Sequence, residues 1–130
     1  MLLEKLGITP GPWQTSGGYG KVFAMRVGGI NMEECLMCVC DIRGWGCLQY
    51  CGEEKAEAEQ EANERLIATA PEMLEALIEF AAEGEESDHE YFPETFKKEI
   101  EIIEKATDKS WEEVRAIFYE SRNIDTKQNP

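Results

Sequence analysis

The sequence predicts an α+β fold: a small N-terminal antiparallel β-sheet followed by a long antiparallel helical pair, with the helices mediating oligomerisation. Apolar residues alternate with a period near two over 21–43, whereas from Glu53 they recur with a period of about 3.6. Strands that precede helices in this way are typical of α+β domains. A chain of 130 residues can bury one modest core. We therefore expect a single domain over 1–130, with a turn-rich segment and β-meander over 1–52, a helical part over 53–122 and a flexible tail over 123–130.

The β-meander is expected to follow a turn-rich segment. Residues 9–20 hold two prolines and four glycines, which are the residue types that mark turns. Lys21–Val27 is typical of a strand, and Gly28-Gly29 fits a tight hairpin turn to a second strand within Ile30–Arg43. Cys47–Tyr50 is the expected third strand.

The helical part begins with an amphipathic segment. Its apolar stripe consists of Ala62, Leu66, Ala70, Met73, Leu74, Leu77, Ile78 and Ala81, and its polar remainder includes Glu57, Glu61, Glu64, Glu72, Glu75 and Glu79. Pro71 lacks an N–H and crowds the preceding turn, so we expect two collinear helices or one kinked helix, with Thr69 as a cap. Pro93 fits the first position of a helix that continues to about Thr107, and the capping box at Ser110 begins a short final helix.

The stripe of the long helix is too apolar for three short strands and two short helices to cover. An uncovered apolar stripe favours association with a second copy through self-complementary contacts. We therefore expect a homodimer formed through the helices.

The net charge of −14 belongs to the second half of the chain. Residues 1–52 hold four basic and four acidic side chains, whereas residues 53–130 hold nine and twenty-three. The negative electrostatic field of this acidic half opposes binding to the phosphates of a nucleic-acid duplex, so polymeric nucleic acid is not an expected partner. The N-terminus lacks the pattern of a signal peptide and no apolar stretch approaches about 18 residues, so we expect an intracellular protein with reduced cysteines and no membrane partner.

The five cysteines have two interpretations. On spacing alone, Cys35, Cys38, Cys40, Cys47 and Cys51 supply enough thiolates for a tetrahedral zinc. However, the first three lie inside an apolar strand, where alternation sends Cys38 and Cys40 to one face and Cys35 to the other. We favour reduced cysteines that fill a small core, and we expect no metal.

The sequence offers no catalytic group. His89 lies alone in an acidic loop, and Ser16 and Ser110 have no motif around them. Gly17–Gly20 is glycine-rich, but no helix follows it to supply the amides of a phosphate site. We expect no catalysis and no cofactor.

Cations of the acidic half are few, and aromatic side chains accompany them. The cations of interest are Arg65, Lys97, Arg115 and Arg122, and the aromatic residues are Phe80, Tyr91, Phe92, Trp111 and Tyr119. A guanidinium forks onto phosphate and a ring stacks on a base, so this combination is what a nucleotide needs. Pairing with glutamates four residues away, as for Glu61 and Arg65, and packing of the rings in the core are the simpler interpretations.

Four segments carry a resemblance to phage proteins. They are Thr9–Trp13, Glu61–Leu77, Phe92–Phe96 and Ile103–Val114. The second resembles the phage pattern Ala-Asn-x-x-Leu-Ile-Ala-x-Ala-Pro-x-Leu-Leu-x-Ala-Leu, with Thr69 and Met73 as departures from it. Together with the cysteine-bearing strands, these segments make the chain similar to the first-described Thoeris anti-defence family.

The resemblance implies a sponge that binds glycocyclic ADP-ribose signals without hydrolysing them. It also implies dimers that assemble further into hexamers, and a second site for cyclic oligonucleotides in some members. We assign the ligand contacts by chemistry. Arg115, Arg122 and Lys97 would hold phosphates, Tyr91 or Phe92 would stack on adenine, Asn63 would bind ribose hydroxyls, Arg65 and Tyr119 would complete the site, and Arg26 and Arg43 would serve the second site.

The alternative is an acidic interaction module that occupies a basic surface of a host protein and inhibits it. This alternative predicts no affinity for a small molecule. In both cases the expected place of action is the cytoplasm of the infected bacterial host.

Overall fold

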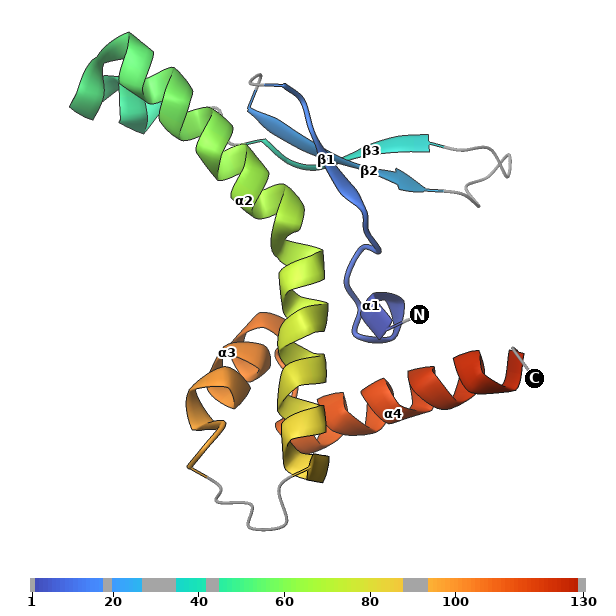
Figure 1. Cartoon of the computed structure of the whole chain (residues 1–130). Helices are drawn as coiled ribbons and strands as arrows, with labels where there is room; N and C mark the ends of the chain where they lie inside the picture. The colour runs from blue at the N-terminus through green and yellow to red at the C-terminus, as the bar shows by residue number, and fades with distance from the viewer. Residues whose placement is uncertain (1, 18–19, 27–34, 42–44, 88–93, 129–130) are drawn as a thin grey trace. The chain divides into compact units, whose positions relative to one another are not determined.

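The structure is a computed structural model, and it confirms the α+β class (Figure 1). It describes residues 2–17, 20–26, 35–41, 45–87 and 94–128. Its elements in chain order are α1 (Leu2–Lys5), β1 (Trp13–Thr15), β2 (Lys21–Arg26), β3 (Cys35–Asp41), α2 (Trp45–Ser87), α3 (Lys97–Thr107) and α4 (Trp111–Gln128). A small antiparallel sheet is thus followed by long helices.

The chain separates into two compact units. The sheet unit is residues 10–72, and the helical unit is residues 1–9 together with 73–130. Helix α2 contributes its first part to the sheet unit and its last turns to the helical unit. The single-domain organisation stays a prediction.

The sheet has three antiparallel strands in the order β1-β2-β3. Trp13 pairs with Ala24, and Lys21 pairs with Asp41. The prediction of a third strand at Cys47–Tyr50 is wrong, because these residues form the start of α2. Extending an existing helix adds one hydrogen bond for each residue fixed, which favours this outcome. The third strand is instead β1, which directly follows Pro12, a residue tolerated at the start of an edge strand.

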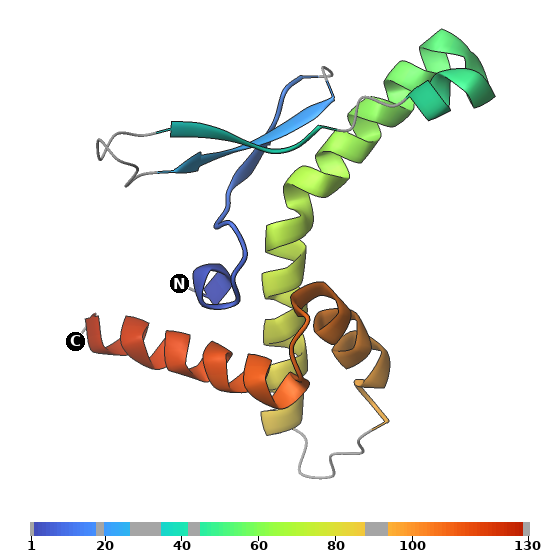
Figure 2. The same cartoon turned by 180° about the vertical axis from the view of Figure 1, so that it is seen from behind.

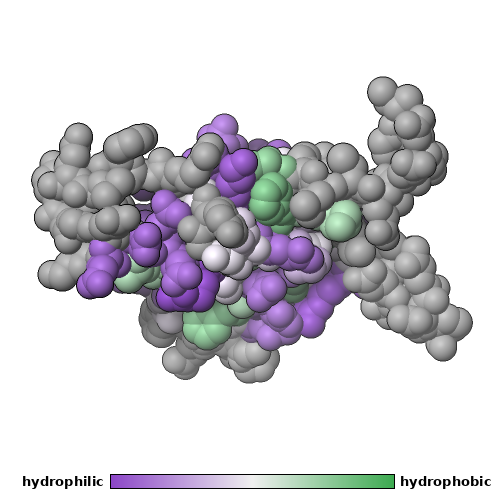
Figure 3. All heavy atoms as spheres, turned by 90° about the horizontal axis from the view of Figure 1, so that it is seen from above, coloured by the Kyte–Doolittle hydropathy of each residue, from purple (hydrophilic) through white to green (hydrophobic). Residues whose placement is uncertain are grey.

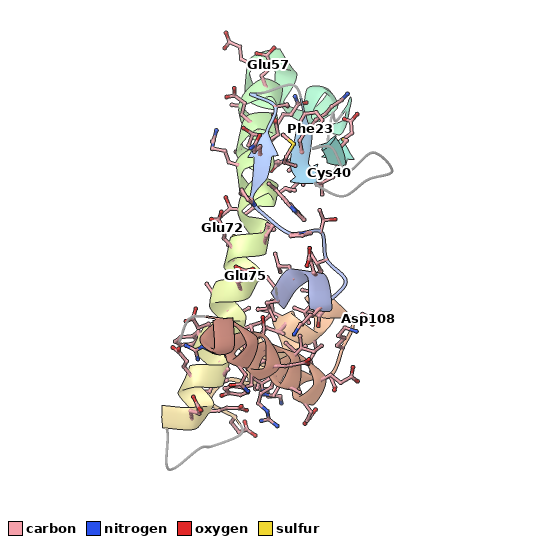
Figure 4. The ribbon with its side chains drawn as sticks, turned by 90° about the vertical axis from the view of Figure 1, so that its right-hand side faces the viewer. Phe23, Cys40, Glu57, Glu72, Glu75 and Asp108 are labelled. Atoms are coloured by element: carbon pink, nitrogen blue, oxygen red, sulfur yellow. The ribbon has the colours of Figure 1, made fainter. Side chains whose placement is uncertain are left out.

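An irregularity in the register separates two of the cysteines. Val22 lies opposite Cys40 and Phe23 lies opposite Cys38, so β3 has one extra residue at this point. Neighbouring residues of a strand face opposite sides of the sheet, so the two cysteines have partners on different faces. The prediction that alternation sends both to one face is therefore wrong. Phe23 and Cys40 are labelled in Figure 4.

Helix α2 runs through Pro71 as one element, so the alternative of two separate helices is wrong. Thr69 is not a cap, since its hydroxyl donates to the Arg65 carbonyl oxygen at 2.7 Å within the helix. Such bonding to the carbonyl four residues earlier is common for threonine inside helices.

The helical unit has one apolar core. The buried members of this core are Leu6, Ile78, Ala81, Ala82, Ile103, Trp111, Val114 and Phe118. Figure 2 shows α3 and α4 beside the last turns of α2. Of the predicted stripe, Ile78 and Ala81 are buried, whereas Met73 is exposed. The stripe is therefore covered only in part.

The ends of α3 and α4 differ from the predicted ones. Helix α3 begins at Lys97 rather than Pro93, because Phe96 has a non-helical backbone (φ −113°, ψ 18°) and packs edge-on against Phe80 with ring centroids 5.4 Å apart. Phe96 also lies against Gly84, where there is no side chain to obstruct it. Helix α4 continues to Gln128. The flexible tail over 123–130 stays a prediction, and residues 129 and 130 lie outside the described residues.

Candidate functional site

Helix α4 places three predicted ligand residues on one side. Ser110 begins this helix as predicted, because its hydroxyl accepts the Glu113 N–H at 3.3 Å. Arg115, Tyr119 and Arg122 follow at spacings of four and three residues, which bring side chains together on a helix. All three contact the last turns of α2. We call these three residues the α4 cationic face.

Arg115 is bound to a carboxylate of α2. Its Nη1 atom donates to Glu85 Oε2 at 3.1 Å, and the other oxygen of Glu85 accepts the Trp111 indole N–H at 2.8 Å. The Glu85 side chain is only 13% exposed. A largely buried carboxylate with two donors is well satisfied, so this pair fixes the start of α4 to α2.

Arg122 has more exposed partners. Its Nη2 atom lies 3.0 Å from Glu83 Oε1 and 3.9 Å from Glu79 Oε1, and the arginine side chain is 48% exposed. Its guanidinium carbon also lies 5.2 Å from the centroid of the buried Phe118 ring. The ring supports the cation from one side, as in a cation–π contact.

Tyr119 lies between the two arginines. Its hydroxyl donates to the Ala82 carbonyl oxygen at 3.3 Å. Burial raises the pKa of Tyr119, and the carboxylates of Glu86 and Glu85 raise this pKa further. The hydroxyl is therefore a neutral donor at neutral pH.

The α4 cationic face has the charge to bind an anion, but its two arginines already contact carboxylates of the same chain. Three glutamates of α2, at positions 79, 83 and 85, neutralise its two arginines. A phosphate ligand would have to displace a carboxylate from one of them.

The other predicted ligand residues are distributed elsewhere. Lys97 is exposed at the start of α3, and Asn63 and Arg65 are exposed on α2 within the sheet unit. Arg26 ends β2, but its side chain is not described. Arg43, Tyr91 and Phe92 lie outside the described residues. Their roles in ligand binding stay predictions.

A second polar constellation, in the sheet unit, was missed by the sequence analysis. Glu64 is 1% exposed, although it was placed on the polar side of the helix. Its Oε1 accepts the N–H of Ser16 at 3.0 Å and the hydroxyl of Ser16 at 2.6 Å, and its Oε2 accepts the N–H of Gly20 at 3.2 Å. The Ser16 hydroxyl in turn accepts the Lys21 N–H at 3.1 Å. The Glu64 carboxylate therefore links Ser16 and Gly20, which precede β2, to helix α2.

One sequence signal could have found Glu64. It lies seven residues before Pro71 and fourteen before Ile78, and both of these residues are buried. Residues seven apart lie on nearly the same side of a helix. A glutamate in line with Pro71 and Ile78 is a candidate for burial, and a buried carboxylate needs specific donors.

The described cysteines carry no metal constellation. The Cys38 thiol donates to the Cys40 carbonyl oxygen at 3.4 Å, and burial raises the pKa of Cys40. Among the described residues, no three ligating side chains gather around one point. The side chains of Cys35, Cys47 and Cys51 are not described, so the absence of zinc stays a prediction.

One face of the molecule can be described by its hydropathy (Figure 3). On the face seen in Figure 3, purple hydrophilic residues predominate and green hydrophobic residues form small groups. Among the described helices, none has the length and apolar character needed to cross a membrane.

Comparison with known proteins places the chain in a phage protein family. The family model described as Salmonella phage P22 protein Y8K6 matches residues 1–110. No curated protein and no solved structure matches the chain.

Proposed function

The chain belongs to the Salmonella phage P22 protein Y8K6 family, and we propose that it is an anti-defence protein that sequesters a cyclic nucleotide-type immune signal without cleaving it. The signal class is glycocyclic ADP-ribose, with cyclic oligonucleotides at a second site. Phage membership and the resemblance to the Thoeris anti-defence family support the proposal. The place of action is the cytoplasm of the infected bacterial host.

The α4 cationic face is the observation that carries this proposal. Arg122 presents a half-exposed guanidinium that is supported by Phe118, and Arg115 lies two turns earlier on the same side of the helix. A guanidinium fork binds phosphate oxygens in a bidentate manner. Against a net charge of −14, such local donors are needed to hold a dianion.

The remaining ligand contacts are proposed on their chemistry. Lys97 would add a phosphate contact, and Tyr91 or Phe92 would supply a stacking ring. Asn63 would bind ribose hydroxyls, and the role of Arg65 in ligand binding stays a prediction. Arg26 and Arg43 would hold the second ligand. Sequestration needs no nucleophile, metal or cofactor, so none is assigned.

Titration calorimetry of the purified protein with glycocyclic ADP-ribose isomers tests this function. We expect binding that weakens at least tenfold in Arg122→Ala, because a charge-assisted contact contributes about 1.5–3 kcal/mol. Lys105→Ala, which removes an exposed cation from α3, should change affinity less than twofold. Equal affinity of the two variants would contradict the assignment of Arg122, and no binding by the wild type would contradict the function itself.

A second candidate is an acidic interaction module that inhibits a host protein. The carboxylate partners of Arg115 and Arg122 favour it, because they neutralise the cations that a phosphate ligand would use. This candidate predicts that Arg122→Ala retains the anti-defence activity of the protein in infected cells. The sponge predicts that the same variant loses this activity.

We propose that α2 packs against a second copy of the chain. Met73 and Phe80 are 51% and 58% exposed on this helix, although both are large and apolar. Leu66, seven residues before Met73, is also exposed. Apolar residues seven apart are the pattern by which two helices pack together. We propose a homodimer that assembles further into hexamers. Light scattering of the Phe80→Glu variant and of the wild type compares their molecular masses, and equal masses would contradict a role of Phe80 in the assembly.

A further inference from the structure

We propose that Glu79 and Glu83 are built-in competitors of the ligand at Arg122. In this proposal the two carboxylates hold the guanidinium while the site is empty, and a phosphate group of the ligand displaces them. The inference rests on the proposed function, since it concerns the regulation of the same site. Of the two arginines of the α4 cationic face, Arg122 would exchange its carboxylate partners for the ligand and Arg115 would not.

The contacts of Arg122 are of the kind that exchange readily. One nitrogen, Nη2, serves both carboxylates, at 3.0 Å for Glu83 and 3.9 Å for Glu79. The side chains of Glu79 and Glu83 are 53% and 48% exposed. Exposed ion pairs of this type contribute little to stability and are screened by salt. A phosphate that engages two guanidinium nitrogens makes the stronger contact.

The contacts of Arg115 are of the opposite kind. Its partner Glu85 is largely buried and also accepts the Trp111 indole N–H at 2.8 Å. A ligand that took Arg115 would leave this buried carboxylate with one donor fewer, which is costly. Arg115 therefore holds α4 on α2, and Arg122 is the arginine that takes the ligand.

The competing carboxylates should also set the affinity. Two negative side chains beside Arg122 repel an incoming dianion and occupy its binding nitrogen. Removing the charge of Glu83 should therefore strengthen binding by about twofold to fivefold, given the size of exposed charge interactions. The effect of Glu79 should be smaller, because its oxygen lies farther from the guanidinium.

Calorimetry with ADP-ribose and inorganic pyrophosphate as probes tests this inference on the full chain. The variants are Glu83→Gln, Glu79→Gln and, as the matched control, Glu75→Gln, an exposed glutamate of the same helix that is labelled in Figure 4. We expect the largest gain in affinity for Glu83→Gln, a smaller gain for Glu79→Gln and a change below twofold for Glu75→Gln. Combining Glu83→Gln with Arg122→Ala should abolish the gain.

Three results overturn the inference. The first is equal affinity of Glu83→Gln and Glu75→Gln, which would mean that only total charge matters. The second is a gain that survives Arg122→Ala, which would place the effect elsewhere. In both cases the wild type still binds, so the proposed function survives. The third is no binding by the wild type or by a Glu79→Gln/Glu83→Gln double variant to these probes or to glycocyclic ADP-ribose, which overturns the function as well.

Discussion

Replacing Glu64 by glutamine should destabilise the protein strongly, although only one atom changes its identity. The carboxylate is 1% exposed and accepts hydrogen bonds from the Ser16 N–H, the Ser16 hydroxyl and the Gly20 N–H. An amide group has one acceptor oxygen, so at least one of these donors would face an NH₂ group. A buried donor left unsatisfied costs about 1–3 kcal/mol, and the bonds that remain lose their charge assistance.

The expected loss in the free energy of unfolding is about 2–4 kcal/mol, summed over one unsatisfied donor and two weakened bonds. Urea denaturation followed by circular dichroism measures it, and the slope of the transition should stay the same because the buried surface does not change. Glu61→Gln is the matched control, since Glu61 is exposed less than one turn earlier on α2. A Glu64→Gln protein within about 0.5 kcal/mol of the control would refute the view that this carboxylate fastens the turn.

Three further predictions concern the rest of the chain. Gly84→Ala should lower the free energy of unfolding by about 1–3 kcal/mol and so lower the thermal midpoint, because an added Cβ would lie 2.8 and 2.9 Å from Cε2 and Cε1 of Phe96. Phe96→Leu in the same chain should recover part of the loss, and no recovery would argue against this contact. Asp108 ends α3 with a φ of 55°, a left-handed conformation that alanine adopts less readily than glycine. Asp108→Ala should therefore lower the free energy of unfolding by about 1 kcal/mol in urea denaturation, whereas Asp108→Gly should not. Equal effects of the two substitutions would contradict a backbone cause of this loss. Iodoacetamide at pH 8 should modify Cys38 faster than Cys40, because Cys38 is exposed and burial raises the pKa of Cys40. Mass spectrometry of Cys38→Ala and Cys40→Ala proteins measures the two rates, and the reverse order would contradict this prediction.

Periodicity predicted the parts of the fold that depend on local pattern. The strand over Lys21–Arg26, the long helix around Pro71 and the cap at Ser110 each follow from spacing or from one residue type. The third strand was assigned to the wrong segment, because Trp13–Thr15 is too short to show a visible alternation, and its pairing partner β2 lies elsewhere in the sequence. A pairing partner that is distant in sequence has no local signature.

The polar contacts of the helices were the part that sequence could not supply. Arg115 and Arg122 were grouped by their chemistry alone, and the structure places both on the side of α4 that contacts α2. The sequence could not indicate that Glu83 and Glu85 of a different helix would neutralise them, because both glutamates belong to a long series of similar residues. Only the packing of α4 on α2 selects these partners.

Native mass spectrometry of the protein mixed with glycocyclic ADP-ribose isomers tests the proposed function most directly. The protein–ligand complex is isolated, denatured by heat and analysed for the released ligand. Sequestration predicts that one isomer is bound and is recovered with its mass and cyclic linkage unchanged. Release of a hydrolysed product would show an enzyme instead, and the absence of any complex would contradict the account.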